Sequence, residues 1–204
     1  MKKLSCGFTL IEMMITLAVF ALLLMIGLPS MTTWLQNAQI RTSAETMQMG
    51  LQFARAEALR RNVPVRFQLV DSLAGGCALS ATGTSWVVNL GDLDVTGACD
   101  AAESEDVDPR ILQKRSGAEG TPNAAVESAG DAKSLVFNGL GRVSPAFAVL
   151  PITRIDVKNP AGGDCQENKG RMRCLRLTVS NGGEVRMCDP AVDPAIYIND
   201  PRLC

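Results

Sequence analysis

Histidine is absent from this chain of 204 residues, although it is the commonest general base and a frequent metal ligand. Its absence excludes Ser-His-Asp and Cys-His catalytic systems and zinc sites that contain histidine. Aromatic residues make up only 4% of the sequence, too few for stacking platforms that bind single-stranded nucleic acid. The formal charge of −1 argues against nucleic-acid binding over the whole surface. The sequence also lacks a phosphate-binding glycine loop, so we expect neither an enzyme nor a bound cofactor.

Charge is also scarce near the N-terminus. Lys2 and Lys3 open the chain, and within residues 8–28 Glu12 is the single charged residue. A helix of this length spans about 30 Å, the thickness of a bilayer core. A carboxylate inside a membrane costs about 2.5–3.5 kcal/mol on insertion scales, so an acid at this position indicates a functional role. The pattern predicts a transmembrane helix over residues 8–28.

A cleaved secretory signal peptide is the competing interpretation, because it also begins with basic residues and an apolar core. Three features favour a retained helix instead. The apolar stretch is longer than a usual signal core, no small-x-small cleavage site ends it, and a helical pattern follows Pro29.

The segment Gly7–Glu12, preceded by Lys2 and Lys3, closely resembles the class III signal of type IV prepilins and type II secretion pseudopilins. The resemblance implies that a prepilin peptidase cleaves between Gly7 and Phe8 and N-methylates Phe8. It also implies that Glu12 pairs with the terminal amine of a neighbouring subunit, so that assembly neutralises its charge. An ordinary signal anchor with an incidental glutamate is the alternative.

A helical pattern continues over residues 29–61. Small and apolar residues recur at alternating spacings of four and three and form one stripe: Ile40, Ala44, Met47, Leu51, Ala54 and Ala58. We expect this stripe to pack against a sheet as ordinary core. One helix from Phe8 to about Arg61 is predicted, with an interruption at Gly27 and Pro29, because proline removes a backbone donor and clashes with the preceding turn.

Residues 62–204 favour short β-strands separated by Gly, Asn, Asp and Pro. Several strands have polar or basic residues at alternate positions, so we expect half-exposed antiparallel strands. The polar stretch 93–132 is expected to be a loop insertion. The predicted strands cover residues 63–70, 85–90, 110–113, 134–137, 152–157, 173–179 and 184–187.

This β-rich region resembles the head of the GspH/FimT family of minor pilins and pseudopilins. Besides the prepilin-like start, the resemblance rests on Arg55–Ala58, Phe137–Arg142 and Gly183–Cys188. It implies an α+β protein with the type IV pilin fold, a long N-terminal helix packed on an antiparallel β-rich head stabilised by disulfides. The implied organisation is a cleaved leader (1–7), a transmembrane helix (8–28), its amphipathic continuation (29–61) and an extracytoplasmic head (62–204).

The cysteine count indicates the compartment. Cys6 lies in the predicted leader, so six of the seven cysteines remain: Cys77, Cys99, Cys165, Cys174, Cys188 and Cys204. An even number in an extracytoplasmic domain suggests three disulfides, with 15 possible connectivities. We favour pairs of sequence neighbours, namely Cys77 with Cys99, Cys165 with Cys174 and Cys188 with Cys204. A zinc site of four thiolates is the alternative, but no C-x-x-C pair occurs and we predict no metal site.

Two clusters of charge stand out in the head. The acidic region 92–108 is expected to be a solvated loop, with a calcium site as the alternative, although EF-hand spacing is absent. Basic residues gather in the last third of the chain: Lys169, Arg171, Arg173, Arg176 and Arg186. A solvated basic face is the plain interpretation of this second cluster.

Some FimT-type members bind DNA through a Gly-Arg-x-Arg motif, so the resemblance makes Arg171, Arg173, Arg176 and Arg186 candidate DNA-binding residues. Gly170–Arg173 matches the motif in letters. Gly183–Arg186 lies where the family motif is expected but has Glu184 in place of the first arginine. Binding to phosphates through such residues would weaken steeply with salt.

The resemblance as a whole implies a minor pilin, a structural and assembly subunit in the tip or priming complex of a type IV pilus. A pseudopilin of the type II secretion system is one alternative, and a DNA-binding minor pilin that acts in DNA uptake is another. The implied partners are other minor pilins and the major pilin or pseudopilins, the prepilin peptidase and the inner-membrane assembly platform. The implied location is the inner membrane, crossed once with the head in the periplasm, and then the pilus or pseudopilus.

Overall fold

The computed structural model describes residues 8–91, 93–144 and 150–204, with only the backbone described at 26–30. One helix, α1, spans Leu10–Arg61 and so ends where the sequence predicts. It remains helical through Gly27 and Pro29, so the predicted interruption is wrong. A single proline removes one backbone donor, a local loss that the hydrogen-bonded turns on both sides can accommodate. The chain divides into two compact units, residues 1–35 and 36–204.

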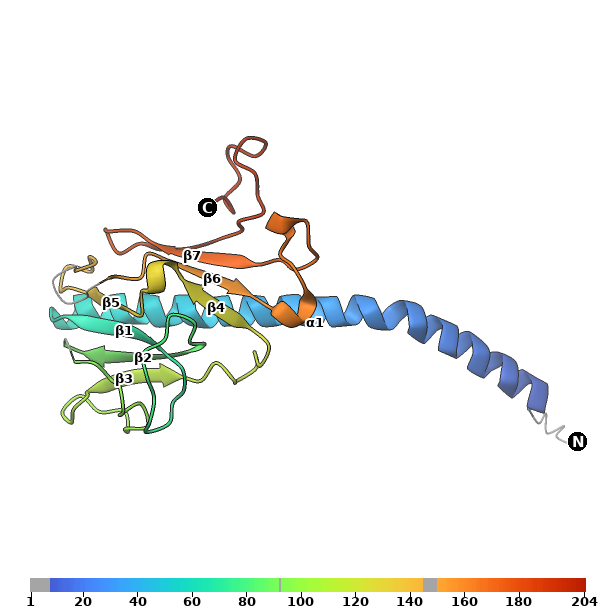
Figure 1. The fold of residues 1–204 in the computed structure, drawn as a ribbon, viewed down its shortest axis with the longest axis horizontal. Coiled ribbons are helices and arrows are strands. Elements are labelled where there is room, and N and C mark those ends of the chain that lie inside the picture. Colours follow the sequence, from blue (N-terminus) through green and yellow to red (C-terminus); the bar gives the residue numbers. More distant parts are fainter. Residues whose placement is uncertain (1–7, 92, 145–149) are drawn as a thin grey trace, which may run out of the picture. The chain divides into compact units, whose positions relative to one another are not determined.

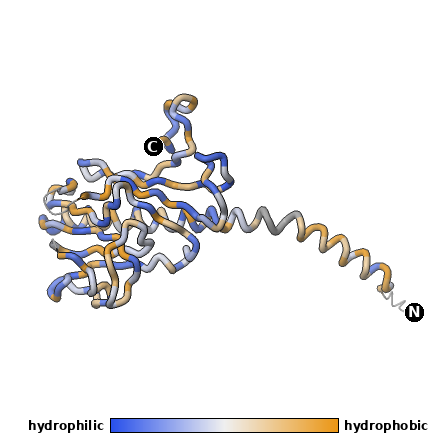
Figure 2. Tube along the Cα trace, viewed as in Figure 1, coloured by the Kyte–Doolittle hydropathy of each residue, from blue (hydrophilic) through white to orange (hydrophobic). Residues whose placement is uncertain are grey.

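The first unit carries the N-terminal part of α1, whose large apolar side chains are exposed. Within residues 8–25 their exposed fractions run from 43% at Leu24 to 79% at Phe8 and Leu10. Figure 2 shows the apolar residues along this part of the helix. Among the helices whose side chains are described, none combines the length and the apolar character needed to cross a membrane.

The second unit combines the rest of α1 with two four-stranded sheets, and every strand pair described is antiparallel (Figure 1). The first sheet has the order β3-β2-β1-β5, from β1 (Val65–Val70), β2 (Ser85–Leu90), β3 (Ile111–Arg115) and β5 (Ser134–Phe137). The second has the order β4-β6-β7-β8, from β4 (Ala125–Ser128), β6 (Arg154–Lys158), β7 (Leu175–Val179) and β8 (Val185–Cys188). Short 3-10 turns occupy Ala129–Asp131, Pro160–Gly162 and Gln166–Asn168. The predicted fold class is confirmed.

Residues of α1 and of both sheets share one apolar core. The predicted helical stripe is confirmed, because each of its six residues is fully buried: Ile40, Ala44, Met47, Leu51, Ala54 and Ala58. The helix comes closest to the first sheet at Gly50. A Cβ atom built there would lie 2.9 Å from Phe67 Cε2 and 3.0 Å from the Trp86 ring, so the glycine sets the spacing between helix and sheet.

The expectation of half-exposed strands is wrong for β1 and β2, in which every residue is buried. Their inner face packs on α1, and their outer face contributes to a second small core made by Val70, Cys77, Val87, Val95, Cys99 and Ile111. The residues that follow β1 and β2 therefore cover the outer face of the sheet. For this reason the polar residues that alternate with apolar ones in these strands are buried and not exposed to solvent. The expected loop insertion 93–132 also contains β4, which the sequence did not predict.

Candidate functional site

The three pieces that carry the family resemblance in the head meet where α1 ends. Arg55 Nε donates a hydrogen bond of 3.2 Å to the carbonyl oxygen of Gly141. A Cβ atom at Gly183 would collide with that same carbonyl and lie 3.3 Å from Arg55 Nε. Gly141 and Gly183 also have φ of +69° and +80°, which side chains rarely adopt. Gly183 therefore requires glycine for two separate reasons, and Gly141 requires it for its backbone conformation.

A tight turn at Asn138–Arg142 completes this junction. The Asn138 side-chain oxygen accepts hydrogen bonds from the backbone N–H groups of Leu140 (3.0 Å) and Arg142 (3.1 Å). A Cβ atom at Gly139 would collide with Asn62, just after the last turn of α1. The junction consists of glycines and of hydrogen bonds between side chains and backbone, so these sequence pieces specify packing.

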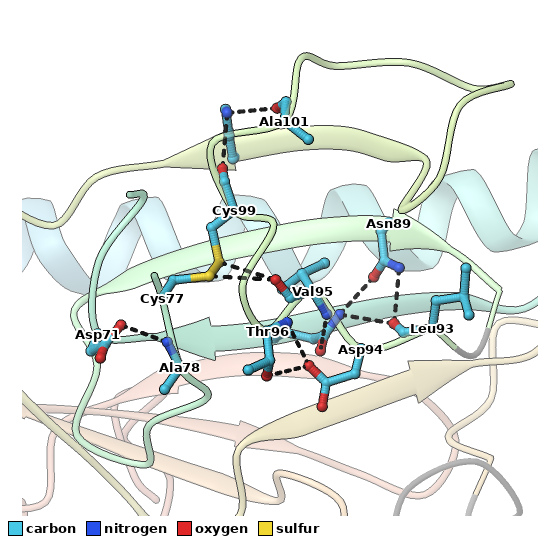
Figure 3. Close-up of a disulfide and its surroundings, with 12 residues drawn as sticks. Asp71, Cys77, Ala78, Asn89, Leu93, Asp94, Val95, Thr96, Cys99 and Ala101 are labelled. Atoms are coloured by element: carbon cyan, nitrogen blue, oxygen red, sulfur yellow. Dashed lines mark hydrogen bonds between the residues drawn. A yellow bond between two sulfur atoms is a disulfide. The ribbon is translucent and has the colours of Figure 1, made fainter. Parts of the chain in front are cut away.

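Three disulfides join the cysteine neighbours favoured by the sequence. They are Cys77–Cys99, Cys165–Cys174 and Cys188–Cys204, with Cα–Cα distances of 6.1, 5.5 and 5.1 Å. The first joins the loop after β1 to residues 93–110 after β2, called here the covering loop, on the outer face of both strands (Figure 3). The second closes a short loop before β7, and the third ties the C-terminal segment to the end of β8.

Two fully buried amides of the first sheet, Gln68 and Asn89, hold the covering loop, and Figure 3 shows Asn89 beside Leu93. Gln68 Nε2 donates to Asn89 Oδ1 (2.8 Å), and both side chains donate to the carbonyl oxygen of Leu93 (3.3 and 3.0 Å). Asn89 Nδ2 also donates to the carbonyl oxygen of Pro109 (3.2 Å). Buried amides of this kind stabilise only when they find partners, so the loop is a fixed part of the head.

The acidic region is held by arginines of α1. Arg61 forms ion pairs with Glu57 and with Glu105, each at 2.6 Å, and Arg60 pairs with Glu57 at 2.8 Å. The hydrogen bond from Arg60 lowers the pKa of the Glu57 carboxyl, and the one from Arg61 lowers that of Glu105. In the part of the chain that is described, no three Cys, Asp or Glu side chains are placed to hold a metal ion.

The four candidate DNA-binding arginines come from two parts of the head, the loop before β7 and the strands β7 and β8. β7 begins at Leu175, so Arg171 and Arg173 precede it and lie, exposed, on either side of the buried Met172. The predicted strand start at Arg173 is wrong because the Cys165–Cys174 disulfide and a bridge between Cys165 and Met172 hold these residues in a separate loop.

Two of the four candidate arginines, Arg173 and Arg176, have acidic partners. Arg176 pairs with Asp156 at 2.6 Å on the outer face of the second sheet, and Arg173 Nη2 lies 3.6 Å from Asp189. Arg186 is exposed on the same sheet face as Arg176, because it stands opposite Thr178 in the register of β7 and β8.

A family model described as Type II transport protein GspH matches residues 43–183, more than half of the chain. The chain belongs to this family. A second model, the prokaryotic N-terminal methylation motif, matches residues 2–28 of the GspH-family chain. The two matches together leave out residues 29–42 of the helix and residues 184–204 at the end of the head.

Two solved structures are similar to the GspH-family chain, both of the type IV minor pilin FimU from Pseudomonas aeruginosa PAO1. One has a TM-score of 0.46 and 17% identity and covers 74% of this chain and 88% of FimU. The other, in a different crystal form, has a TM-score of 0.44 and 17% identity and covers 72% and 90%. No curated protein sequence matches the chain at a significant level.

The residues of the methylation motif lie at the start of α1. Gly7 lies outside the described residues. Phe8 is 79% exposed, and the Glu12 N–H donates to Thr9 Oγ1 at 3.3 Å, so Thr9 caps the first turn. Glu12 is exposed on the helix in this single chain. Their predicted roles in cleavage, methylation and charge pairing remain predictions.

Sequence reasoning missed the buried amides that fix the loops of the head. Gln68 and Asn89 alternate with apolar residues in strand patterns and therefore look like solvent-facing positions. Asn159 is also fully buried, and its amide donates to Gln39 Oε1 on α1 at 3.0 Å. Only the position of Asn159 before Pro160, typical of a turn or cap, gave a local signal.

Proposed function

We propose that this GspH-family chain is a minor pilin, anchored in the inner membrane by the N-terminal part of α1 and assembled into a type IV pilus. The observation that carries the proposal is the exposed apolar surface of residues 8–25 beside a methylation motif. Apolar surface in water costs about 25 cal/mol per Å². Such a continuous surface needs either lipid or the helices of other subunits to cover it.

Processing supplies the group that Glu12 needs in the assembled filament. In the proposal, cleavage between Gly7 and Phe8 leaves a methylated amine at Phe8. In the membrane the carboxylate of Glu12 is costly, and pairing with the amine of the next subunit removes that cost. Assembly is then favoured by both helix packing and charge neutralisation. The head supplies the surface that selects neighbouring pilins and has no catalytic role.

The same machinery serves a pseudopilus, and the matching family model bears the name of a type II transport protein. A GspH-like pseudopilin of the type II secretion system is therefore the alternative. Both functions use the same helix and the same processing, and they differ in the partners of the head and the filament.

Incorporation into filaments tests the proposal. Glu12→Ala is expected to leave the chain in the membrane fraction and to remove it from sheared pili, because insertion becomes easier while the charge pair is lost. Thr16→Ala, one turn further along the same helix, is the matched control and should be incorporated normally. Normal incorporation of Glu12→Ala would contradict the charge-pairing mechanism, and absence of the parent chain from pili and pseudopili would contradict the proposed function.

A further inference from the structure

A loop of the head, residues 159–174, is fixed to α1 at the very start of the second unit. The buried Asn159 donates to Gln39 Oε1 at 3.0 Å, and the backbone N–H of Arg173 donates to Asn37 Oδ1 at 2.7 Å. Met172 is only 1% exposed, and a Cβ atom at Gly162 would meet both its sulfur and the Gln36 side chain. The loop is therefore held at helix residues 36–39.

The tip of this loop is rigid and presents basic side chains. The Cys165–Cys174 disulfide closes it, and backbone hydrogen bonds join Gln166 N to Met172 O (2.8 Å) and Gly170 N to Cys165 O (2.9 Å). Lys169 has φ of +62°, which is uncommon for a lysine, and its N–H bonds to Gln166 O at 3.0 Å. Lys169 and Arg171 are both exposed.

The place of the loop along the chain brings it close to the proposed membrane span. The span ends at residue 28, and the first helix residue that contacts the loop, Gln36, follows after about 12 Å of helical rise. Trp34 lies between them and is 68% exposed, beside the exposed Met31 and Leu35. Tryptophan is enriched where helices leave the hydrocarbon core. The loop is thus attached to α1 eight to eleven residues after the end of the proposed span.

We propose that Lys169 and Arg171 bind the phosphate groups of anionic phospholipids at the membrane surface from which the head emerges. The inference rests on the membrane anchoring proposed above. This contact would give the two basic side chains a role in orienting the unassembled head on the membrane. The acids of the loop, Asp164 and Glu167, and the pairing of Arg173 with Asp189 keep the contact weak, so extraction into a filament can release it.

The test uses the full chain in vesicles of phosphatidylcholine, with or without about 30% phosphatidylglycerol, so that basic residues near the surface meet anionic lipid. An impermeant amine reagent labels exposed lysines, and mass spectrometry compares Lys169 with Lys133, an exposed lysine beside β5. Each basic residue near an anionic surface favours contact by about fivefold. We expect labelling of Lys169 relative to Lys133 to fall about fivefold or more with anionic lipid and to recover in about 0.5 M salt.

Variants separate a specific contact from a general surface effect. Arg171→Gln should remove most of the protection of Lys169, whereas Arg142→Gln, which changes the same charge at the far end of the head beside Leu59, should retain it. Equal labelling in both vesicles, with the chain floating with them, would overturn this inference alone. Failure to float with either vesicle would overturn the anchoring as well. Protection by duplex DNA on phosphatidylcholine vesicles, without protection by anionic lipid, would overturn the lipid contact in favour of DNA.

Discussion

Replacing Gly50 by alanine sets two effects of opposite sign against each other. Alanine is favoured over glycine in a helix interior by about 0.8–1.0 kcal/mol. At this position, however, the new Cβ would lie 2.9 Å from Phe67 Cε2, closer than such atoms approach in real structures, and 3.0 Å from the Trp86 ring, which is tighter than most Cβ contacts. Forcing extra volume into a packed core costs about 1–3 kcal/mol. Subtracting the helix gain from this cost leaves about 0–2 kcal/mol, and we expect Gly50→Ala to lower the free energy of unfolding by the upper half of that range, since both rings belong to the shared core.

Thermal unfolding of the full chain in mild detergent, followed by circular dichroism, measures this change. For a unit of this size, about 1 kcal/mol corresponds to a shift in Tm of about 2–4 °C. Gly76→Ala is the control, because no atom lies within 4 Å of a Cβ there. In a Phe67→Leu background, which removes the nearest ring atom, the cost of Gly50→Ala should fall by about 1 kcal/mol. A Gly50→Ala protein as stable as its parent would refute the argument that glycine sets the helix–sheet spacing.

Three further predictions concern the junction, the ion pairs and the covering loop. Gly183→Ala should destabilise the head by about 1–3 kcal/mol, because φ is +80° and a Cβ would meet the Gly141 carbonyl, whereas Gly182→Ala, with one contact at 3.6 Å, should change Tm little. The pKa of Glu57 is lowered in the folded state by the hydrogen bond from Arg60. The advantage of the parent over Glu57→Gln should therefore be full above about pH 4.5 and disappear as the pH falls through that lowered pKa, which unfolding midpoints across pH measure. Replacing Cys77 and Cys99 together by alanine should lower the free energy of unfolding by about 3 kcal/mol, from the loop-entropy model and their sequence separation of 22. It should also speed amide hydrogen exchange in β1 and β2, whereas removal of the Cys188–Cys204 disulfide should leave those amides protected.

Patterns with a strict period predicted much of this fold. The stripe from Ile40 to Ala58 follows the helical repeat and is fully buried, and seven of the eight strands were expected within two residues of their observed ends. β4 was missed because Ala125–Ser128 is short and contains Glu127, which pairs with Lys158 of β6 across the sheet. A strand that is stabilised mainly by its neighbouring strand shows only a weak hydrophobic pattern in its own sequence.

Except at Pro29, where the loss of one backbone donor is local, the errors come from contact between distant parts of the chain. Gln68 was expected to face solvent, yet it is buried under a loop that begins more than 20 residues later. Pro29 was expected to break α1, yet the helix continues, since the loss of one donor is local. The ion pair between Arg176 on β7 and Asp156 on β6 also joins residues 20 positions apart. None of these partners can be paired by spacing along the sequence.

The mass of the mature protein, purified from cells that make a prepilin peptidase, tests the central claim most directly. The account predicts a chain that begins at Phe8, lacks residues 1–7 and carries one methyl group on its terminal amine, with Gly7→Ala retaining the full leader. Ser5→Ala, within the leader but away from the bond, should be processed as the parent is. A protein that keeps residues 1–7, or one that is cut after the apolar run, would contradict the assignment as a processed pilin.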